Sequence, residues 1–152
     1  EALTALKHNN TAENVAIAEK MRRRLIEQIE AEAFAAPFDM YKLNNASKDI
    51  NRAAIVDADP KTLALMEEVN REVASFKFIL TKIAEDNQSA VFRLNNTFVT
   101  EKEQTVIVGD MLLDRFLVKS ITPHEVRLED TSPRGAGRQL LSRYMESVEA
   151  LK

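Results

Sequence analysis

The fold is decided by residues 90–130, AVFRLNNTFVTEKEQTVIVGDMLLDRFLVKSITPHEVRLED. Apolar side chains recur there at every second position, and Asn, Gly, Asp and Pro interrupt the pattern every few residues. A period of two places alternate side chains on one face of a β-strand. The pattern predicts five short strands, around Phe92–Leu94, Phe98, Thr105–Val108, Phe116–Ile121 and Val126–Leu128. Short strands joined by tight turns are typical of a small twisted β-sheet or partial barrel.

Helical sequence precedes this stretch. Asn10 and Glu13 have the spacing of a capping box, in which two side chains satisfy backbone N–H groups at the start of a helix. Apolar residues then recur at intervals of three and four, as on one face of a helix: Val15, Ala18, Met21, Leu25, Ile29 and Ala33. Residues 35–59 contain Pro37 and several turn-forming residues, so we expect a poorly specified, partly helical connection there.

A second long helix is predicted to begin at Pro60 after an Asp59 N-cap, because the N–H that proline lacks has no helical partner there. Its apolar residues have the three-and-four spacing of a coiled-coil seam: Met66, Val69, Val73, Phe76, Leu80 and Ile83. We expect this helix to run to about Asp86 and to pack on the first helix, on a second copy or on a partner. A C-terminal helix is predicted over Gln139–Leu151, with Leu140, Leu141, Tyr144, Val148 and Leu151 on one side.

The predicted fold class is therefore α+β. Residues 1–88 form a helical region, in which the long N-terminal helices make a hairpin or a coiled-coil-like pair. Residues 89–152 form a small β module, a twisted sheet or partial barrel, followed by the C-terminal helix. A chain of 152 residues is long enough to bury a core in this arrangement.

The composition narrows the possible classes of protein. Apolar residues make up 45% and charged residues 30% of the chain, which is typical of a globular domain. The 21 basic and 24 acidic residues give a net charge of -3, so we expect no nucleic-acid partner. No apolar run reaches the roughly 18 residues of a membrane span, so membrane contact is expected only through a segment outside this chain. The chain has no cysteine and hence no disulfide or thiolate nucleophile.

The residue types that carry chemistry do not form a recognisable site in the sequence. His8 and His124 lie far apart and lack the spacing of metal ligands. Ser120 and Ser132 have no activating base nearby, and Gly135–Gly137 lacks the preceding strand and the further glycine of a dinucleotide-binding loop. We therefore expect no enzymatic activity, no cofactor and no metal.

Four runs within the β stretch carry a family resemblance: Ala90–Asn96, Val106–Leu112, Phe116–Ile121 and Val126–Leu128. In their order and spacing, with Gly109-Asp110 between two strands, they resemble the periplasmic homology-region domain. That domain occurs in the inner-membrane component of type II secretion systems and in the pilus-assembly lipoprotein of type IV pili. The chain departs from the pattern in the long turn at Thr100–Gln104 and in the long helices that precede the module.

The resemblance implies a non-enzymatic protein-protein interaction subunit of a bacterial envelope assembly. Such a protein would be periplasmic and tethered at the inner membrane through a segment that precedes Glu1. Its β module would dock onto a secretin or another assembly subunit, for example by adding a strand to an exposed sheet edge. The helices would act as a spacer or an oligomerising stalk.

Two sets of residues are candidates for contacts with a partner or with a second copy. The first is the helical seam, Met66, Val69, Val73, Phe76, Leu80 and Ile83. The second lies on the β module and comprises Phe92, Phe98, Val106 and Val108. The same residues can also be interpreted as a hydrophobic core.

Two other classes of function stay open. A soluble oligomeric structural subunit, cytoplasmic or viral, would use the helices as a stalk and carry the β module on it. An anion- or nucleic-acid-binding module would use Arg22–Arg24, or Arg134 and Arg138, and its binding would fall steeply with salt.

Overall fold

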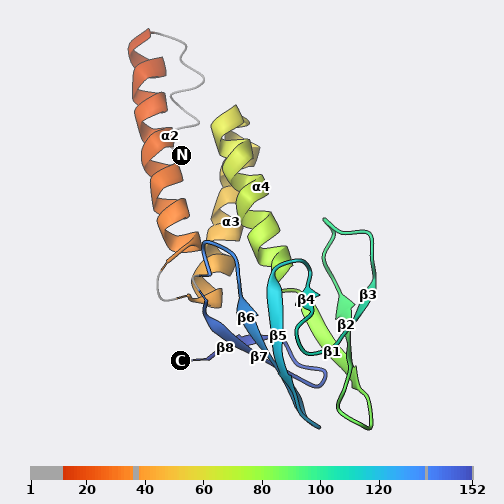
Figure 1. Cartoon of the computed structure of the whole chain (residues 1–152). Coiled ribbons are helices and arrows are strands. Elements are labelled where there is room, and N and C mark those ends of the chain that lie inside the picture. The colour runs from red at the N-terminus through yellow and green to blue at the C-terminus, as the bar shows by residue number, and fades with distance from the viewer. Residues whose placement is uncertain (1–11, 36–37, 136, 152) are drawn as a thin grey trace. The chain divides into compact units, whose positions relative to one another are not determined.

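A computed structural model describes residues 12–35, 38–135 and 137–151. Within these residues three helices are followed along the chain by two antiparallel β-sheets (Figure 1). The predicted α+β class is confirmed. The chain divides into two compact units, Glu1–Val73 and Ala74–Lys152, whereas the sequence pattern placed the change from helical to β structure after residue 88.

The first unit is built on helices α2 (Ala12–Ala33), α3 (Met40–Val56) and α4 (Pro60–Ser75), of which α4 extends two residues into the second unit. The helix predicted from the first apolar stripe is confirmed as α2, while its Asn10 cap lies outside the described residues. Helices α2 and α3 run side by side in opposite directions (Figure 1). Each buries residues at helical spacing, such as Leu43, Ala46 and Ile50 of α3, because one stripe of an amphipathic helix faces the core.

Helix α3 occupies the segment that was predicted to be a poorly specified connection. Asp39 caps its start by accepting hydrogen bonds from two N–H groups of the first turn. Ser47 and Asn51 bond the side chain of Asn70 in α4 at 3.1 and 3.0 Å. Polar residues that favour turns in an isolated peptide therefore join two helices here. The helical part of the prediction for residues 35–59 is confirmed, whereas the segment is a regular helix and not a poorly specified connection. Pro37 lies outside the described residues.

Helix α4 begins where the sequence predicts and ends earlier than predicted. Asp59 accepts a hydrogen bond from the backbone N–H of Lys61 at 2.9 Å, and Pro60 is the first helical residue. The helix ends at Ser75, so the prediction that it continues to Asp86 is wrong.

The apolar residues after α4 fit two periods at once. Phe76 and Leu80 are four residues apart, as on a helix, but Phe76, Phe78 and Leu80 are also two apart, as on a strand. The segment Phe78–Ile83 forms strand β1, in which Phe78 and Leu80 are fully buried and the residue between them is not. Antiparallel pairing with β2 (Ala90–Leu94) favours the extended form, because the ladder and the burial of alternate side chains stabilise it together.

The second unit contains two sheets. The first has the order β1–β2–β3, and its third strand is β3 (Glu103–Val106). The second has the order β4–β5–β6–β7–β8, with strands Met111–Leu112, Phe116–Ile121, Glu125–Asp130, Gln139–Arg143 and Glu149–Ala150. Single bridges from Ile79 to Ser147 and from Leu80 to Tyr144 connect the sheets, which do not close into a barrel.

Three phenylalanines form the centre of the second unit. Phe78 and Phe92 belong to the first sheet and Phe116 to the second, and all three are fully buried. The ring centroid of Phe78 lies 5.6 Å from that of Phe92 and 5.4 Å from that of Phe116. Tilted ring contacts of this kind add to the free energy gained by burial, so these rings join the two sheets.

The C-terminal segment is β structure, and the prediction of a helix over Gln139–Leu151 is wrong. Strand β7 pairs with β6 from Glu129–Gln139 to Glu125–Arg143, and β8 pairs with β7. Met145 adopts a positive φ of 60° in the turn between β7 and β8, which a continuous helix does not allow. Because Leu140 and Leu141 are both buried, these neighbours match a strand with two covered faces as well as one side of a helix.

The return strand predicted around Phe98 is also wrong. Residues 95–102 form a loop, and the strand begins only at Glu103. Asn96 is buried in this loop, and its side-chain oxygen accepts a hydrogen bond from the N–H of Phe98 at 2.8 Å. The bond gives the segment a local turn in place of ladder pairing.

Replacing Asn70 with alanine is expected to destabilise the first unit, because Ser47 and Asn51 lose the side chain that they share. We expect the free energy of unfolding to fall by about 1–2 kcal/mol, measured by urea unfolding followed by far-UV circular dichroism. Asn44→Ala, at an exposed position of α3, is the control and should change it by less than about 0.5 kcal/mol. Equal losses in the two variants would contradict the structural role of Asn70.

Candidate functional site

The residues of the predicted helical seam do not share one helix face. Met66, Val69 and Val73 lie on α4, whereas Phe76 follows it and Leu80 and Ile83 lie in β1. Val69, Phe76 and Leu80 are buried in the core. Met66, Val73 and Ile83 are partly exposed. The structure therefore divides the seam between a helix and a strand.

The predicted residues of the β module fall into a buried and an exposed pair. Phe92 and Val106 have no exposed surface, whereas Phe98 is 40% exposed and Val108 is 54% exposed. Ile107, which the sequence analysis did not single out, is 52% exposed. The signal for Ile107 was the run Val106-Ile107-Val108. Successive side chains of a strand point to opposite faces, so three apolar neighbours cannot all face one core.

A rigid turn holds Ile107 and Val108 at the end of β3. Gly109 adopts a positive φ of 95°, a conformation that favours glycine. Its N–H donates to the carbonyl oxygen of Val118 at 2.9 Å, and the N–H of Val118 donates to the carbonyl of Asp110 at 2.9 Å. The carboxylate of Asp110 accepts from the N–H of Ile107 at 3.0 Å. The two exposed side chains are therefore presented on a backbone that has little freedom to move.

The outer edge of β3 is open. The N–H of Leu94 donates to the carbonyl of Lys102, so Leu94 and Lys102 form a hydrogen-bonded pair of the β2–β3 ladder. Such pairs alternate along an antiparallel ladder, which directs the N–H and C=O groups of Glu103 and Thr105 away from β2. No further strand pairs with this side of β3 within the described residues. We call this edge, together with Phe98, Ile107 and Val108, the β3 surface.

The side chain of Gln104 links β3 to the other sheet without extending the ladder. Its amide nitrogen donates to the carbonyl of Met111 at 2.8 Å, and its oxygen accepts from the N–H of Leu113 at 3.0 Å. The side-chain amide thus makes the two hydrogen bonds with β4 that a neighbouring strand would otherwise make. These bonds do not involve the backbone groups of Glu103 and Thr105, which still point away from β2.

A buried carboxylate forms the main ionic cluster of the second unit. Asp130 has no exposed surface and accepts hydrogen bonds from Arg115 at 2.9 Å and from Arg138 at 2.7 Å. Both guanidinium groups also lie over the ring of Phe76, at 5.0 and 5.1 Å from its centroid. A Cβ on Gly135 would overlap the carboxylate, so this position of the loop admits no side chain.

The electrostatics of this cluster fit a structural role. Burial by itself raises the pKa of Asp130, but hydrogen bonds from Arg115 and Ser132, together with the charge of Arg115, outweigh it and lower the pKa to about 2. The carboxylate is therefore ionised at neutral pH and fastens the loop after β6 to β5. It is neither a proton donor nor a free base under these conditions.

Two of the arginines considered for anion binding, Arg22 and Arg138, are paired with carboxylates of the same chain. Arg22 bonds Asp57 across α2 and α3, and that hydrogen bond, opposed by burial and helped by the nearby carboxylates, raises its pKa. Arg138 is paired with Asp130. An external anion would have to compete with these carboxylates.

Metal-ligating residues do not gather in the part of the chain that the structure describes. No three His, Asp or Glu side chains lie close enough together there to hold a metal ion. His124 is exposed in the turn before β6, and His8 lies outside the described residues. Within residues 12–35, 38–135 and 137–151, each helix is too short or too polar to cross a membrane.

Comparison with known proteins adds no family. No protein-family model matches the chain, and neither the curated proteins nor the solved structures contain a match. The resemblance to the periplasmic homology-region domain therefore stays a prediction.

Asp130→Asn is expected to remove the acid sensitivity that this cluster confers. Because the pKa falls from 3.8 to about 2 on folding, the ionised carboxylate contributes stability that is present above pH 3.8 and lost as the pH falls through about 2. Asp130→Asn should cost about 3 kcal/mol at neutral pH, since it leaves two arginines without their partner.

The difference in unfolding free energy between wild type and Asp130→Asn should then shrink by about 2 kcal/mol on acidification, measured by urea unfolding at a series of pH values. Glu129→Gln is the control, because Glu129 is partly exposed and its carboxylate accepts a hydrogen bond from the uncharged side chain of Gln139. A difference that stays constant with pH for Asp130→Asn would refute the assigned role.

Proposed function

We propose that this chain is a non-enzymatic protein-protein interaction subunit of a bacterial envelope assembly of the type IV pilus or type II secretion kind, and that it docks onto a partner through the β3 surface. One observation carries the proposal. Strand β3 ends its sheet with outward-directed backbone groups at Glu103 and Thr105, beside the exposed side chains of Ile107 and Val108.

Docking takes place by strand addition. A partner strand bonds the N–H and C=O groups of Glu103 and Thr105, which supplies affinity that depends little on sequence. Phe98 precedes β3 in the chain and Ile107 and Val108 follow it, and these exposed side chains supply apolar contacts that select the partner. The turn at Gly109-Asp110 fixes two of these side chains in advance, so little conformational entropy is lost there on binding.

The envelope setting is supported by the resemblance of residues 90–130 to the periplasmic homology-region domain. The partner is then a secretin or another assembly subunit, and the protein is periplasmic and tethered at the inner membrane. The alternative, a soluble oligomeric structural subunit built on a helical stalk, places the protein in a different compartment, which a fractionation experiment can determine.

The full-length product is expected to fractionate with the inner membrane of its native host. An antibody against this chain should detect it there, and protease added to spheroplasts, but not to intact cells, should digest it. A cytoplasmic protein of known abundance serves as the control for cell lysis. Recovery of the product in the cytoplasmic fraction, resistant to protease in spheroplasts, would favour the alternative.

Thr105→Pro is expected to abolish docking without unfolding the protein. Proline lacks the N–H that a partner strand needs, yet an edge strand tolerates it where that N–H faces outward. The chain serves as bait in a pull-down from solubilised envelope of the native host, and bound proteins are identified by mass spectrometry. Wild type should enrich a secretin or another assembly subunit, and Thr105→Pro should lose it at least about tenfold.

Thr105→Val is the matched control, because it keeps the backbone N–H and a β-branched side chain. It should retain binding, and urea unfolding should show that the proline variant remains folded. Equal capture by the proline and valine variants would contradict strand addition at β3.

A further inference from the structure

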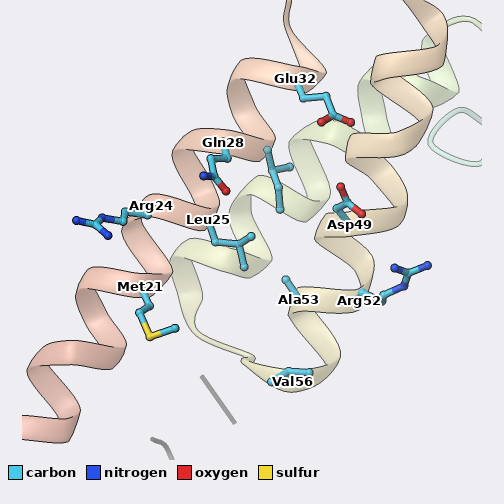
Figure 2. A pocket seen from close by; sticks show the side chains of 10 residues that line it. Met21, Arg24, Leu25, Gln28, Glu32, Asp49, Arg52, Ala53 and Val56 are labelled. Atoms are coloured by element: carbon cyan, nitrogen blue, oxygen red, sulfur yellow. The ribbon is translucent and has the colours of Figure 1, made fainter. Parts of the chain in front are cut away.

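An open groove runs along the first unit between α2 and α3 (Figure 2). Its volume is about 590 Å³. Its apolar lining comes from both helices and comprises Met21, Leu25, Ile29, Ala53 and Val56. Ile29 is buried, whereas Val56 is 39% exposed, so the groove is open to contact along part of its length. We call it the α2–α3 groove.

The groove follows from the spacing of residues on the two helices. Met21, Leu25 and Ile29 recur every fourth residue of α2, and Ala53 and Val56 lie one turn apart on α3. The polar contacts to α4 use other residues, namely Ser47 and Asn51 on α3 and Glu19 on α2. The apolar lining of the groove is therefore shared by the two helices of the hairpin.

The charges on the rim of the groove are separated along its length. Glu32 and Asp49 lie toward one end, and Arg24 and Arg52 lie nearer the other (Figure 2). None of these four side chains takes part in an ion pair among the described residues. The uncharged Gln28 is four residues from Arg24 and four from Glu32 on α2.

This pattern is self-complementary. Two copies can be related by a two-fold axis that lies in the plane between them and is perpendicular to the groove at the level of Gln28. The α2 helices of the two copies then run in opposite directions. Arg24 of one copy then faces Glu32 of the other, and Arg52 faces the opposite Asp49. The same operation places the apolar linings of the two grooves against each other.

We propose that the α2–α3 groove is a homodimer interface, in which two copies of this chain pack their α2–α3 hairpins face to face and antiparallel as a four-helix arrangement. Apolar contacts exclude water along the centre, and the rim charges fix the direction. The proposal goes beyond docking through the β3 surface and does not depend on it, because the two sets of residues lie in different units.

The test measures mass in solution for wild type and two charge-reversed variants. The acidic variant carries Arg24→Glu and Arg52→Glu, and the basic variant carries Glu32→Arg and Asp49→Arg. Light scattering should give wild type about twice the 17.2 kDa mass of one chain. Each variant alone should be a folded monomer whose dimer dissociation constant is raised at least about 100-fold, because like charges meet across the axis. An equimolar mixture of the two should form a dimer again.

Each other outcome overturns the proposal. A monomeric wild type would mean that another partner or segment covers the groove, and variants that stay dimeric would place the interface elsewhere. A mixture that stays monomeric would reject the antiparallel register.

A cross-linking experiment tests the same register without changing any charge pair. The chain has no cysteine, so Gln28→Cys introduces a single thiol at the proposed axis. Mild oxidation should convert most of this variant to a disulfide-linked dimer. Glu27→Cys, exposed on the neighbouring face of α2, should remain largely monomeric. Equal cross-linking of the two variants would contradict the interface even if the charge variants fail to fold.

Discussion

The packing of Phe78 between Phe92 and Phe116 is the contact on which the second unit depends. It brings β1 and β2 against β5. The two sheets are also joined by single bridges, by the amide of Gln104 and by the hydrogen bonds of the Gly109-Asp110 turn to Val118. A unit of this size has few residues with which to build a core, and these three rings are the largest of its fully buried side chains. The same packing explains why residues 78–83 leave the helix, since a continuous α4 would remove Phe78 from this centre.

The aromatic core continues into the ionic cluster. Phe76 makes a tilted contact with Phe116, with ring centroids 5.7 Å apart, and the guanidinium groups that bind Asp130 also lie over its ring. Buried ion pairs contribute little net stability when every charge is matched, but they impose a single geometry because an unmatched charge is costly. Asp130 thus fixes the conformation of the loop after β6, and Gly135 is required there for space and not for mobility.

The sequence predicted those features that neighbouring residues determine, and it failed where residues far apart in the chain determine the structure. The cap at Asp59-Pro60 is local chemistry and was predicted correctly. Phe76 and Leu80 satisfy helical and strand periods together, so only the partner strand β2 decides between them. The leucines of β7 are covered on both faces, a pattern that mimics a helix until β6 is in place. At the candidate site, Val108 and Phe98 were named from the sequence, whereas Ile107 and the open edge of β3 follow from strand order, which no local pattern contains.

The β3 edge and the α2–α3 groove are proposed to bind different molecules, a partner protein and a second copy of this chain. An open edge invites pairing with any strand, including that of another copy, and the charges of Glu101, Lys102 and Glu103 beside it discourage such pairing. A dimer held by the α2–α3 hairpins would not use β3. Each dimer would therefore keep two β3 edges free to bind a partner. A partner with two binding strands would then meet the second edge at high effective concentration wherever its spacing allows both to engage. Weak strand addition at each edge would in that case suffice for tight attachment, so the proposed docking would need no more than the four residues of β3.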